Sequence, residues 1–338
     1  MMRIRRARVL EILRRFRGRR LAVVGDLMLD RFIRGGVTRI SPEAPVPVVG
    51  VERVDLHLGG SGNVVANLLA LGARPVPFGV VGRDEAGALI RKELRRSRVP
   101  TGGIVSDAGR ATTVKMRIVA QNQQMVRADW ETRRAVEGVV EKQLLRAFAR
   151  ALPALDGVVI SDYDKGAITA SLLEELLQRS QKRRIPVFVD PKIPHANFYR
   201  SATLVTPNWR EAEQLFRMCT WNYRARHLDV EEAGRELLAF FESPFVLITR
   251  GAEGMTLVER SPRRPRHVRT THIPAVAREV YELTGAGDTV TSTVSLAYVA
   301  GASMLEAAIL ANYAAGVVVG KLGTATVTPE ELLAATRG

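Results

Sequence analysis

A glycine-rich turn that ends in an aspartate, Thr284-Gly285-Ala286-Gly287-Asp288, stands directly before a stretch with helical periodicity. Glycines at a helix start let backbone N–H groups converge, and the helix dipole adds partial positive charge, so Gly285, Ala286 and Gly287 are a candidate anion hole. Asp288 falls in the first helical turn, where the dipole favours its ionised form. A carboxylate beside an anion hole suits phosphoryl transfer, with Asp288 as the base that deprotonates a hydroxyl. An ordinary glycine turn explains the same residues equally well.

Asn208 and Glu211 follow a predicted strand that ends at Val205. They are three residues apart on a predicted helix, so their side chains can face the same side. Their oxygen atoms could hold hydrated Mg²⁺ near phosphates. The alternative is helix capping, with Asn at the N-cap and Glu three positions later, and these two residues alone favour capping.

Two further glycine clusters lie where ligands bind in α/β proteins. Thr249, Gly251 and Gly254 follow another predicted strand, and ligands of open α/β sheets bind beyond the carboxyl ends of strands. They could admit a nucleotide close to the backbone or form only a hairpin turn. The segment Gly59-Gly60-Ser61-Gly62-Asn63 opens a predicted helix and could bind a hydroxyl or phosphate, or form only a tight turn.

A basic strand face is the last chemical candidate. Lys115 and Arg117 are two residues apart on a predicted strand and therefore share one face. Arg127 lies on the next predicted strand. Such a face could bind a phosphate group, with arginine forming a bidentate fork, or it could simply be solvated.

The elements that would position these residues alternate between strand and helix. Short apolar runs predict strands at 21–25, 75–81, 157–161, 186–190, 202–205 and 245–249, and a hairpin at 255–269. Helical periodicity predicts helices at 62–71, 84–97, 139–152, 170–183, 208–218, 230–241, 287–300, 303–322 and 329–336. This alternation predicts an α/β fold with a mainly parallel central sheet flanked by helices.

Two extended segments, at about 33–58 and 110–128, do not fit the alternation. The prolines within Ser41-Pro42-Glu43-Ala44-Pro45-Val46-Pro47-Val48 exclude a central strand. We expect both segments to form a small β-sheet lid beside the main domain.

The chain has 338 residues, of which 46% are hydrophobic and 25% charged, and these values exclude disorder and collagen. No apolar run approaches the ~20 residues of a membrane span. The only cysteine, Cys219, cannot form an intrachain disulfide, which suits a cytoplasmic protein. The five histidines show no pairing typical of a metal site.

The net charge of +15 is concentrated in residues 1–20, which hold nine arginines and one glutamate. We expect an arginine-rich helical extension there and a main domain over residues 21–338. Val9, Ile12, Leu13 and Phe16 follow the spacing of an amphipathic helix. This helix could pack on the domain, bind an anionic membrane or nucleic acid, or be a targeting presequence. The second option corresponds to a non-catalytic binding protein, although we expect no nucleic-acid partner.

The order of an early Gly-Gly-x-x-Asn, an Asn-x-x-Glu and a late Gly-Ala-Gly-Asp resembles the PfkB, or ribokinase-like, family of carbohydrate kinases. The resemblance implies a ribokinase-like fold with a β-sheet lid. It implies that Asp288 is the catalytic base, that residues 285–287 are the anion hole, and that Asp30 binds a sugar hydroxyl. It places Asn208 and Glu211 at the Mg-phosphate site, with the metal bound through water.

Further segments are similar to the D-glycero-β-D-manno-heptose-7-phosphate kinases of this family: residues 41–48, 122–124 with Arg127 and Asp129, 161–166, 190–192, 280–289 and 316–324. The resemblance implies phosphorylation of the anomeric hydroxyl, for nucleotide-activated heptose of surface polysaccharide. The ATP and phosphate residues would include Thr249, Gly251, Gly254, Lys192 and Asn312. Those for the sugar phosphate would be Asp30, Gly59, Gly60, Asn63, Lys115, Arg117, Arg127, Asp162 and Lys165. Ile193-Pro194-His195-Ala196 departs from the glycine usual at this place.

The implied cofactors are ATP and Mg²⁺, with a monovalent cation left open. The implied assembly is a homodimer formed through the lid, because exposed edge strands seek cover. The chain ends after the kinase segment, so we expect a separate adenylyltransferase in the pathway. Another kinase of the family, for fructose 6-phosphate or a nucleoside, is the alternative.

Overall fold

The computed structural model describes residues 4–121, 123–220, 228–261, 267–276, 283–321 and 325–336. Within them, a nine-stranded sheet forms the centre of the molecule, in the order β13-β12-β11-β10-β9-β8-β1-β4-β5. Neighbouring strands from β11 to β5 are parallel, and the β12 and β13 pairings are antiparallel. The strands are β1 (Arg20–Gly25), β4 (Arg74–Gly82), β5 (Ile104–Asp107), β8 (Gly157–Ser161), β9 (Val187–Asp190), β10 (Leu204–Val205), β11 (Phe245–Thr249), β12 (Met255–Arg260) and β13 (Val268–Ile273).

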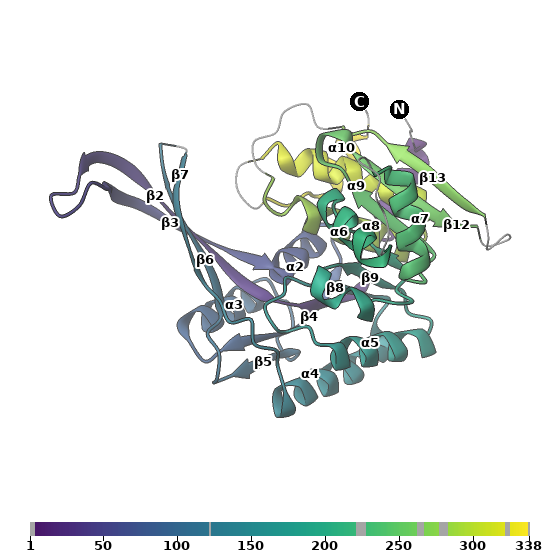
Figure 1. Ribbon diagram of the computed structural model, residues 1–338, viewed down its shortest axis with the longest axis horizontal. Helices are drawn as coiled ribbons and strands as arrows, with labels where there is room; N and C mark the ends of the chain where they lie inside the picture. The colour runs from purple at the N-terminus through teal and green to yellow at the C-terminus, as the bar shows by residue number, and fades with distance from the viewer. Residues whose placement is uncertain are drawn as a thin grey trace.

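Helices cover both faces of this sheet (Figure 1). They are α1 (Arg6–Arg14), α2 (Ser61–Ala70), α3 (Glu85–Arg96), α4 (Gly138–Ala151), α5 (Ala170–Lys182), α6 (Trp209–Cys219), α7 (Val230–Phe240), α8 (Ala286–Val299), α9 (Met304–Val319) and α10 (Pro329–Ala335). Adjacent strand residues face opposite layers: Val23 packs in the cluster of α2, α8 and α9, whereas Val24 packs in the cluster of α4, α5 and α7. The predicted α/β fold with a mainly parallel sheet is confirmed.

A second, four-stranded sheet projects from the body (Figure 1). Its order is β3-β2-β6-β7, formed by β2 (Leu27–Ile40), β3 (Pro47–Gly60), β6 (Thr113–Ala120) and β7 (Gln123–Trp130). We call this sheet the lid. The lid starts earlier and ends later in the chain than expected. It starts earlier because residues 27–29, which are buried like a core strand, already pair with β3 and β6. Strand β5 was not predicted.

The lid has one polar and one apolar face, as its register shows. Asp30 pairs with His57 and Lys115, and Lys115 pairs with Asp129, so these four side chains share the polar face. On the other face Ile33, Val54, Ile118 and Val126 form one row across the sheet. Val54 and Val126 are each about half exposed, so this apolar face is uncovered in the isolated chain.

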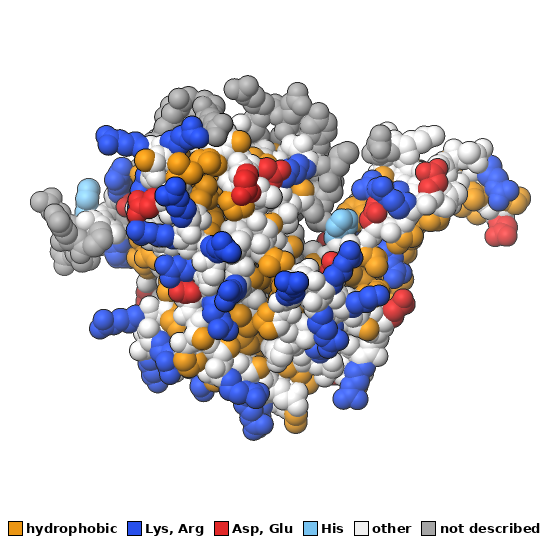
Figure 2. Space-filling model, turned by 180° about the vertical axis from the view of Figure 1, so that it is seen from behind, with side chains coloured by type: hydrophobic (Ala, Val, Ile, Leu, Met, Phe, Trp, Pro, Cys, Tyr) orange, Lys and Arg blue, Asp and Glu red, His pale blue; other side chains and the backbone are white. Residues whose placement is uncertain are grey.

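Helix α1 belongs to the body of the protein. Val9, Ile12 and Phe16 have no exposed surface and pack in the same core as α8 and α9. The Arg8 guanidinium forms an ion pair with Glu306 at 2.9 Å. Lys and Arg side chains are scattered over the face seen in Figure 2, with few carboxylates among them. The amphipathic stripe is therefore used for packing, which is the first of the three interpretations, and it cannot also insert into a membrane.

Among the helices of the described residues, none has the length and apolar character that crossing a membrane requires. Several sequence features lie outside the described residues: the hairpin tip at 262–266, Asn122, and the portions 280–282 and 322–324 of the segments that carry the resemblance.

Candidate active site

Asp288 is buried in the first turn of α8, and both of its carboxylate oxygens accept a hydrogen bond. The Tyr163 hydroxyl donates to Oδ1 at 2.7 Å, and the Asn63 amide donates to Oδ2 at 2.7 Å. Burial raises the pKa of Asp288 to about 6, while these two hydrogen bonds act in the opposite direction. A carboxylate of this kind is ionised at neutral pH and can take a proton there.

The glycine at the N-cap of α8 makes room for Asn63. Gly285 is the N-cap of α8 and has a φ of +82°. A Cβ atom at this position would lie 2.5 Å from the Asn63 Nδ2 atom. Asn67, one turn further along α2, donates to the Asn63 carbonyl at 3.0 Å and accepts from the Thr289 hydroxyl at 3.0 Å. Thus α2 and α8 are joined by polar contacts directly at the carboxylate.

Asp26, which follows β1, holds the loop that carries Tyr163. Its buried carboxylate accepts hydrogen bonds from the backbone amides of Tyr163 at 2.9 Å, Lys165 at 3.2 Å and Ala167 at 3.0 Å. Burial and the charge of Asp162 raise the pKa of Asp26 to about 6, although the three amides favour its ionised form. Asp26 and Tyr163 were missed as site residues. Asp26 directly follows a predicted strand and Tyr163 lies in the segment 161–166 that carries the resemblance, but neither residue was assigned a role.

A cavity of about 390 Å³ adjoins the start of α8. Four residues predicted to bind ATP, Thr249, Gly251, Gly254 and Asn312, line it together with Ala286 and Gly287. Met255, Val276, Val290 and Val319 contribute apolar walls, which suit a flat base. The Asn312 side-chain amide donates to the Pro274 carbonyl at 2.8 Å and so shapes the wall. The structure therefore brings these four predicted residues together.

Asn208 and Glu211 form a capping box at the start of α6. The Asn208 side chain accepts from the Glu211 amide at 3.0 Å, and Glu211 accepts from the Asn208 amide at 3.1 Å. Glu211 also forms an ion pair with the Lys192 ammonium group. The two residues therefore cap helix α6, and their role in holding a metal stays a prediction.

The side-chain oxygens of Asn208 and Glu211 are of the kind that a divalent cation binds when phosphates and water complete its coordination. Burial, followed by the charge of Asp288, holds the pKa of Asp190 well above its usual range, and Lys192 is the nearby cation that opposes this effect. No group of three or more His, Cys, Asp or Glu side chains capable of holding a metal occurs among the described residues. A metal would therefore depend on the nucleotide for part of its coordination.

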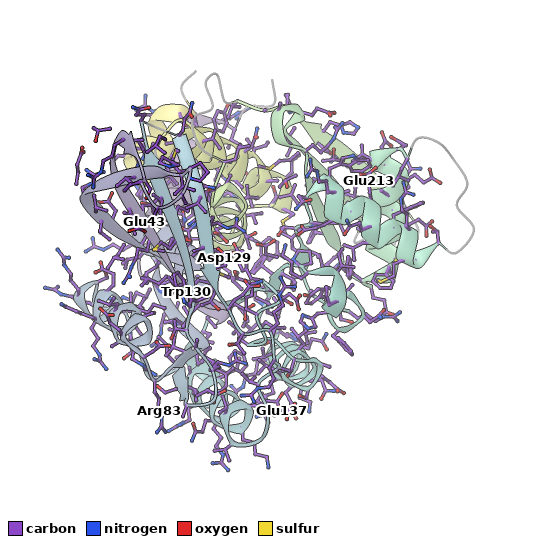
Figure 3. The ribbon with its side chains drawn as sticks, turned by 60° about the vertical axis from the view of Figure 1, so that its left-hand side comes forward. Glu43, Arg83, Asp129, Trp130, Glu137 and Glu213 are labelled. Atoms are coloured by element: carbon purple, nitrogen blue, oxygen red, sulfur yellow. The ribbon has the colours of Figure 1, made fainter. Side chains whose placement is uncertain are left out.

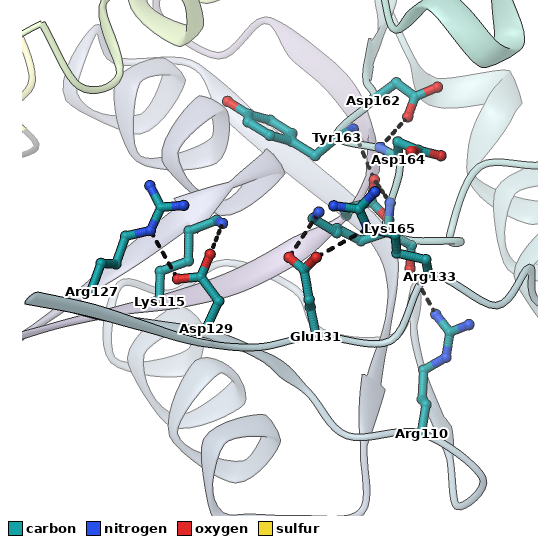
Figure 4. A network of polar contacts seen from close by, with 11 residues as sticks. Arg110, Lys115, Arg127, Asp129, Glu131, Arg133, Asp162, Tyr163, Asp164 and Lys165 are labelled. Carbon is teal, nitrogen blue, oxygen red and sulfur yellow. Dashed lines mark hydrogen bonds and ion pairs between the residues drawn. The ribbon is translucent and has the colours of Figure 1, made fainter.

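The three predicted phosphate-binding cations share the polar face of the lid, but each contacts a carboxylate. Arg117 lies 2.6 Å from Asp30, with its guanidinium 5.1 Å from the centre of the Phe32 ring. Lys115 and Arg127 both contact Asp129, at 3.2 and 3.0 Å (Figure 4). Asp129 and Trp130 are neighbours on β7 and thus point to opposite faces (Figure 3).

Gly59 and Gly60 shape the base of the lid where β3 meets α2. A Cβ atom at Gly59 would lie 2.5 Å from an Asp30 carboxylate oxygen, so this glycine admits the Asp30 side chain. Gly60 is the N-cap of α2 and has a φ of +57°. Gly59 therefore acts on the predicted sugar site through Asp30, whereas a Cβ atom at Gly60 would lie 2.5 Å from the Asp26 carbonyl oxygen.

Asp162, which is predicted to bind the sugar, has a side chain that is fully engaged within the protein, and its substrate role stays a prediction. It has no exposed surface, and its carboxylate accepts from the Tyr199 hydroxyl at 2.6 Å and the Asp164 amide at 2.8 Å. His195 Nδ1 lies 2.6 Å from the same carboxylate, and this contact raises the pKa of His195. The unusual histidine after Lys192 therefore joins a buried structural network.

Two other predicted contacts are already occupied. The Lys165 ammonium group forms an ion pair with Glu131 at 2.8 Å (Figure 4). The Ala286 amide, one of the three expected in the anion hole, donates to the Leu283 carbonyl at 3.2 Å. Each group would have to exchange its partner to bind a phosphate.

Comparison with known proteins agrees with this geometry. A model of the pfkB family of carbohydrate kinases matches residues 19–331. The chain is 44% identical over 315 residues to a protein named "Bifunctional protein HldE" from Geotalea uraniireducens. The match covers 93% of this chain and 62% of that relative, so the chain spans less than two thirds of the relative's length.

Solved structures show the same fold. Arabidopsis thaliana ribokinase complexed with ribose and ATP has a TM-score of 0.70 at 18% identity, covering 95% of this chain and 99% of that one. Phosphofructokinase-2 from Escherichia coli in complex with potassium has a TM-score of 0.74 at 16% identity, covering 95% and 98%.

Proposed function

The chain belongs to the pfkB family of carbohydrate kinases, and we propose that its substrate is D-glycero-D-manno-heptose 7-phosphate. The kinase would transfer the γ-phosphoryl group of ATP to the anomeric hydroxyl and form the 1,7-bisphosphate. The observation that carries the proposal is the position of Asp288. Its buried carboxylate lies at the α8 start that the 390 Å³ cavity adjoins, and the charge of Asp30 on the polar lid face acts on its pKa.

In the proposed reaction, Asp288 accepts the proton of the sugar hydroxyl. The hydroxyl oxygen forms a bond to the γ-phosphorus, the bond from this phosphorus to the β-phosphate oxygen breaks, and ADP leaves. Gly285 and Gly287 would direct backbone amides at the transferring group, and Lys192 would add positive charge. When bound, Mg²⁺ neutralises charge on the phosphates, and Asn208 and Glu211 would hold it through water.

The polar face of the lid supports a phosphorylated sugar. Lys115, Arg117 and Arg127 supply three cations, and Asp30 and Asp129 supply two carboxylates on the same face. A substrate phosphate would take the place of a carboxylate as the ion-pair partner of these cations. Asp30 would then be free to accept a hydrogen bond from a sugar hydroxyl. Closing the lid over the sugar would exclude water that could otherwise hydrolyse ATP.

The choice of heptose rests on the resemblance of residues 41–48 and 161–166 to the heptose kinases, and on the HldE relatives. The product would feed nucleotide-activated heptose.

The apolar face of the lid supports a homodimer. Val54, Leu56, Val126 and Trp130 are 41–51% exposed and lie on one side of the sheet. A second copy of the lid offers a surface of the same character, and covering both faces removes this apolar area from water. Val126→Glu should therefore shift the protein from dimer to monomer in light scattering. An unchanged mass of the variant would contradict the assigned interface.

The test is ADP release with Mg-ATP and heptose 7-phosphate, fructose 6-phosphate, ribose or adenosine as acceptor. Asp288→Asn is the blank, and it should lose most turnover while its Tm stays within a few degrees. Selective turnover of the heptose phosphate supports the proposal. Preference for another acceptor would keep the kinase and discard the heptose assignment, and a fully active Asp288→Asn would remove Asp288 as the base.

A further inference from the structure

We propose that Tyr163 is a positioning residue for the catalytic base, because its hydroxyl fixes the Asp288 carboxylate and favours the ionised form. The inference rests on the proposed role of Asp288 and adds a residue to it. Tyr163 would not touch the phosphoryl group. It would act only through the carboxylate that takes the proton.

The geometry assigns one donor to each carboxylate oxygen. Tyr163 Oη lies 2.7 Å from Oδ1 of Asp288, and Asn63 Nδ2 lies 2.7 Å from Oδ2. Two donors on opposite oxygens define the rotation of the carboxylate plane, and each oxygen keeps a lone pair for a substrate hydroxyl. Asn63 reaches Asp288 from α2 and Tyr163 reaches it from the loop after β8, so the two donors are held by separate elements.

Tyr163 is itself held at both ends. Its backbone amide donates to buried Asp26 at 2.9 Å, and its ring lies 5.9 Å from the Lys192 ammonium group. The chain is also held on both sides of Tyr163. Strand β8 precedes it, and the backbone amides of Lys165 and Ala167 after it donate to the same Asp26 carboxylate. Figure 4 shows the ring extending from this loop. We therefore expect the phenol to keep its place and to set the position of the Asp288 carboxylate.

The phenol can only donate to Asp288. Burial and the charge of Asp288 hold the pKa of Tyr163 well above its usual range, so the proton stays on the phenol oxygen at neutral pH. Three other charged groups interact electrostatically with Asp288, and they come from different parts of the chain. They are Asp30 of β2, Asp190 of β9 and Lys192. Because Asp30 disfavours the ionised carboxylate, a neutral donor such as Tyr163 offsets that effect without introducing a competing base.

Tyr163→Phe removes the hydroxyl and leaves the ring in place. Losing a hydrogen bond to a charged group should raise the pKa of Asp288 by about one to two units. The acid limb of kcat should therefore move to higher pH by the same amount, with the KM for ATP unchanged. Tyr298→Phe is the matched control, because this tyrosine lies at the far end of α8 and packs against Phe188 and Phe245.

A second measurement does not depend on turnover. Carboxyl ¹³C NMR of the protein without substrate, with the Asp288 signal assigned from Asp288→Asn, should show the raised pKa in Tyr163→Phe and not in Tyr298→Phe. In the unmutated protein, the Tyr163 ring ¹³Cζ signal should titrate together with Asp288, which tests the contact even where the variant does not fold.

The outcomes separate the two proposals. An Asp288 pKa that is the same in Tyr163→Phe, or a Tyr163 signal that does not respond to Asp288, would overturn the positioning role. Absence of turnover with all four acceptors would instead refute the proposed function, and the NMR titration would still report whether Tyr163 positions Asp288.

Discussion

Gly285→Ala tests whether the glycine at the N-cap of α8 is needed to make room for Asn63. The added Cβ atom would lie 2.5 Å from Asn63 Nδ2, far inside van der Waals contact. Because α2 packs against α8 here, we expect the Asn63 side chain to move away and its hydrogen bond to Asp288 to be lost. Gly72→Ala is the matched control: Gly72 has a φ of +89°, but its Cβ would meet nothing within 4 Å.

The magnitude has two parts. A left-handed alanine costs about 1–2 kcal/mol of unfolding free energy in both variants. Loss of a hydrogen bond to a charged group costs a further 1.5–3 kcal/mol, approximately, in Gly285→Ala alone. The same loss should raise the Asp288 pKa from about 6 by roughly one to two units. At pH 7 the ionised fraction would then fall from about nine tenths to between a half and a tenth.

The assay combines urea unfolding with kcat as a function of pH for the two variants and the unmutated protein. Gly285→Ala should be less stable than Gly72→Ala and should lose roughly two- to tenfold in kcat at pH 7, with partial recovery at pH 8–9, given the pKa rise above. Gly72→Ala should keep its acid limb. If the two variants lose equal stability and have the same acid limb, steric admission of Asn63 is not the reason for Gly285.

Three other predictions follow from the same contacts. Since burial raises the Asp288 pKa to about 6, kcat should fall about tenfold per unit as pH drops below 6, and a flat profile down to pH 5 would contradict a buried carboxylate base. Lys115→Ala and Arg117→Ala should raise the KM for the sugar phosphate more than the KM for ATP, and no effect on either KM would remove the lid cations from the substrate site. Ile12→Ala, at a fully buried position of α1, should lower the unfolding free energy by about 2–5 kcal/mol in urea denaturation and leave both KM values unchanged. A loss below 1 kcal/mol would contradict the packing of α1 in the core.

The local periodicity of the sequence was enough to predict the architecture. Apolar runs and helical stripes report which residues are buried, so the strand and helix alternation of the body emerged without tertiary information. The apolar stripe of α1 was visible in the same way. The boundaries of the lid were predicted less accurately. Residues 27–29 are apolar and buried, so the sequence does not show that they already belong to β2 of the lid. Strand β5, with four residues, is too short to show a period.

The grouping of the residues predicted to bind ATP was also accessible from the sequence. Thr249, Gly251 and Gly254 follow a strand end, and Gly287 follows a glycine turn at a helix start, so topology alone brings them to one edge of the sheet. Glycine positions carry this information because only the backbone has to approach the ligand.

The pairing of polar side chains was decided only by the tertiary structure. Local patterns report burial but do not name a partner that lies more than 100 residues away. Tyr163 and Asn63 meet on Asp288 from separate elements, whereas Asp162, in the same loop as Tyr163, turns inward to Tyr199 and His195. Thus the sequence determined the sheet, the glycine turns and the place of Asp288 at the start of a helix. The packing of α2, α8 and the loop after β8 determined how the Asp288 carboxylate is held, because hydrogen-bond geometry depends on distances that no local period encodes.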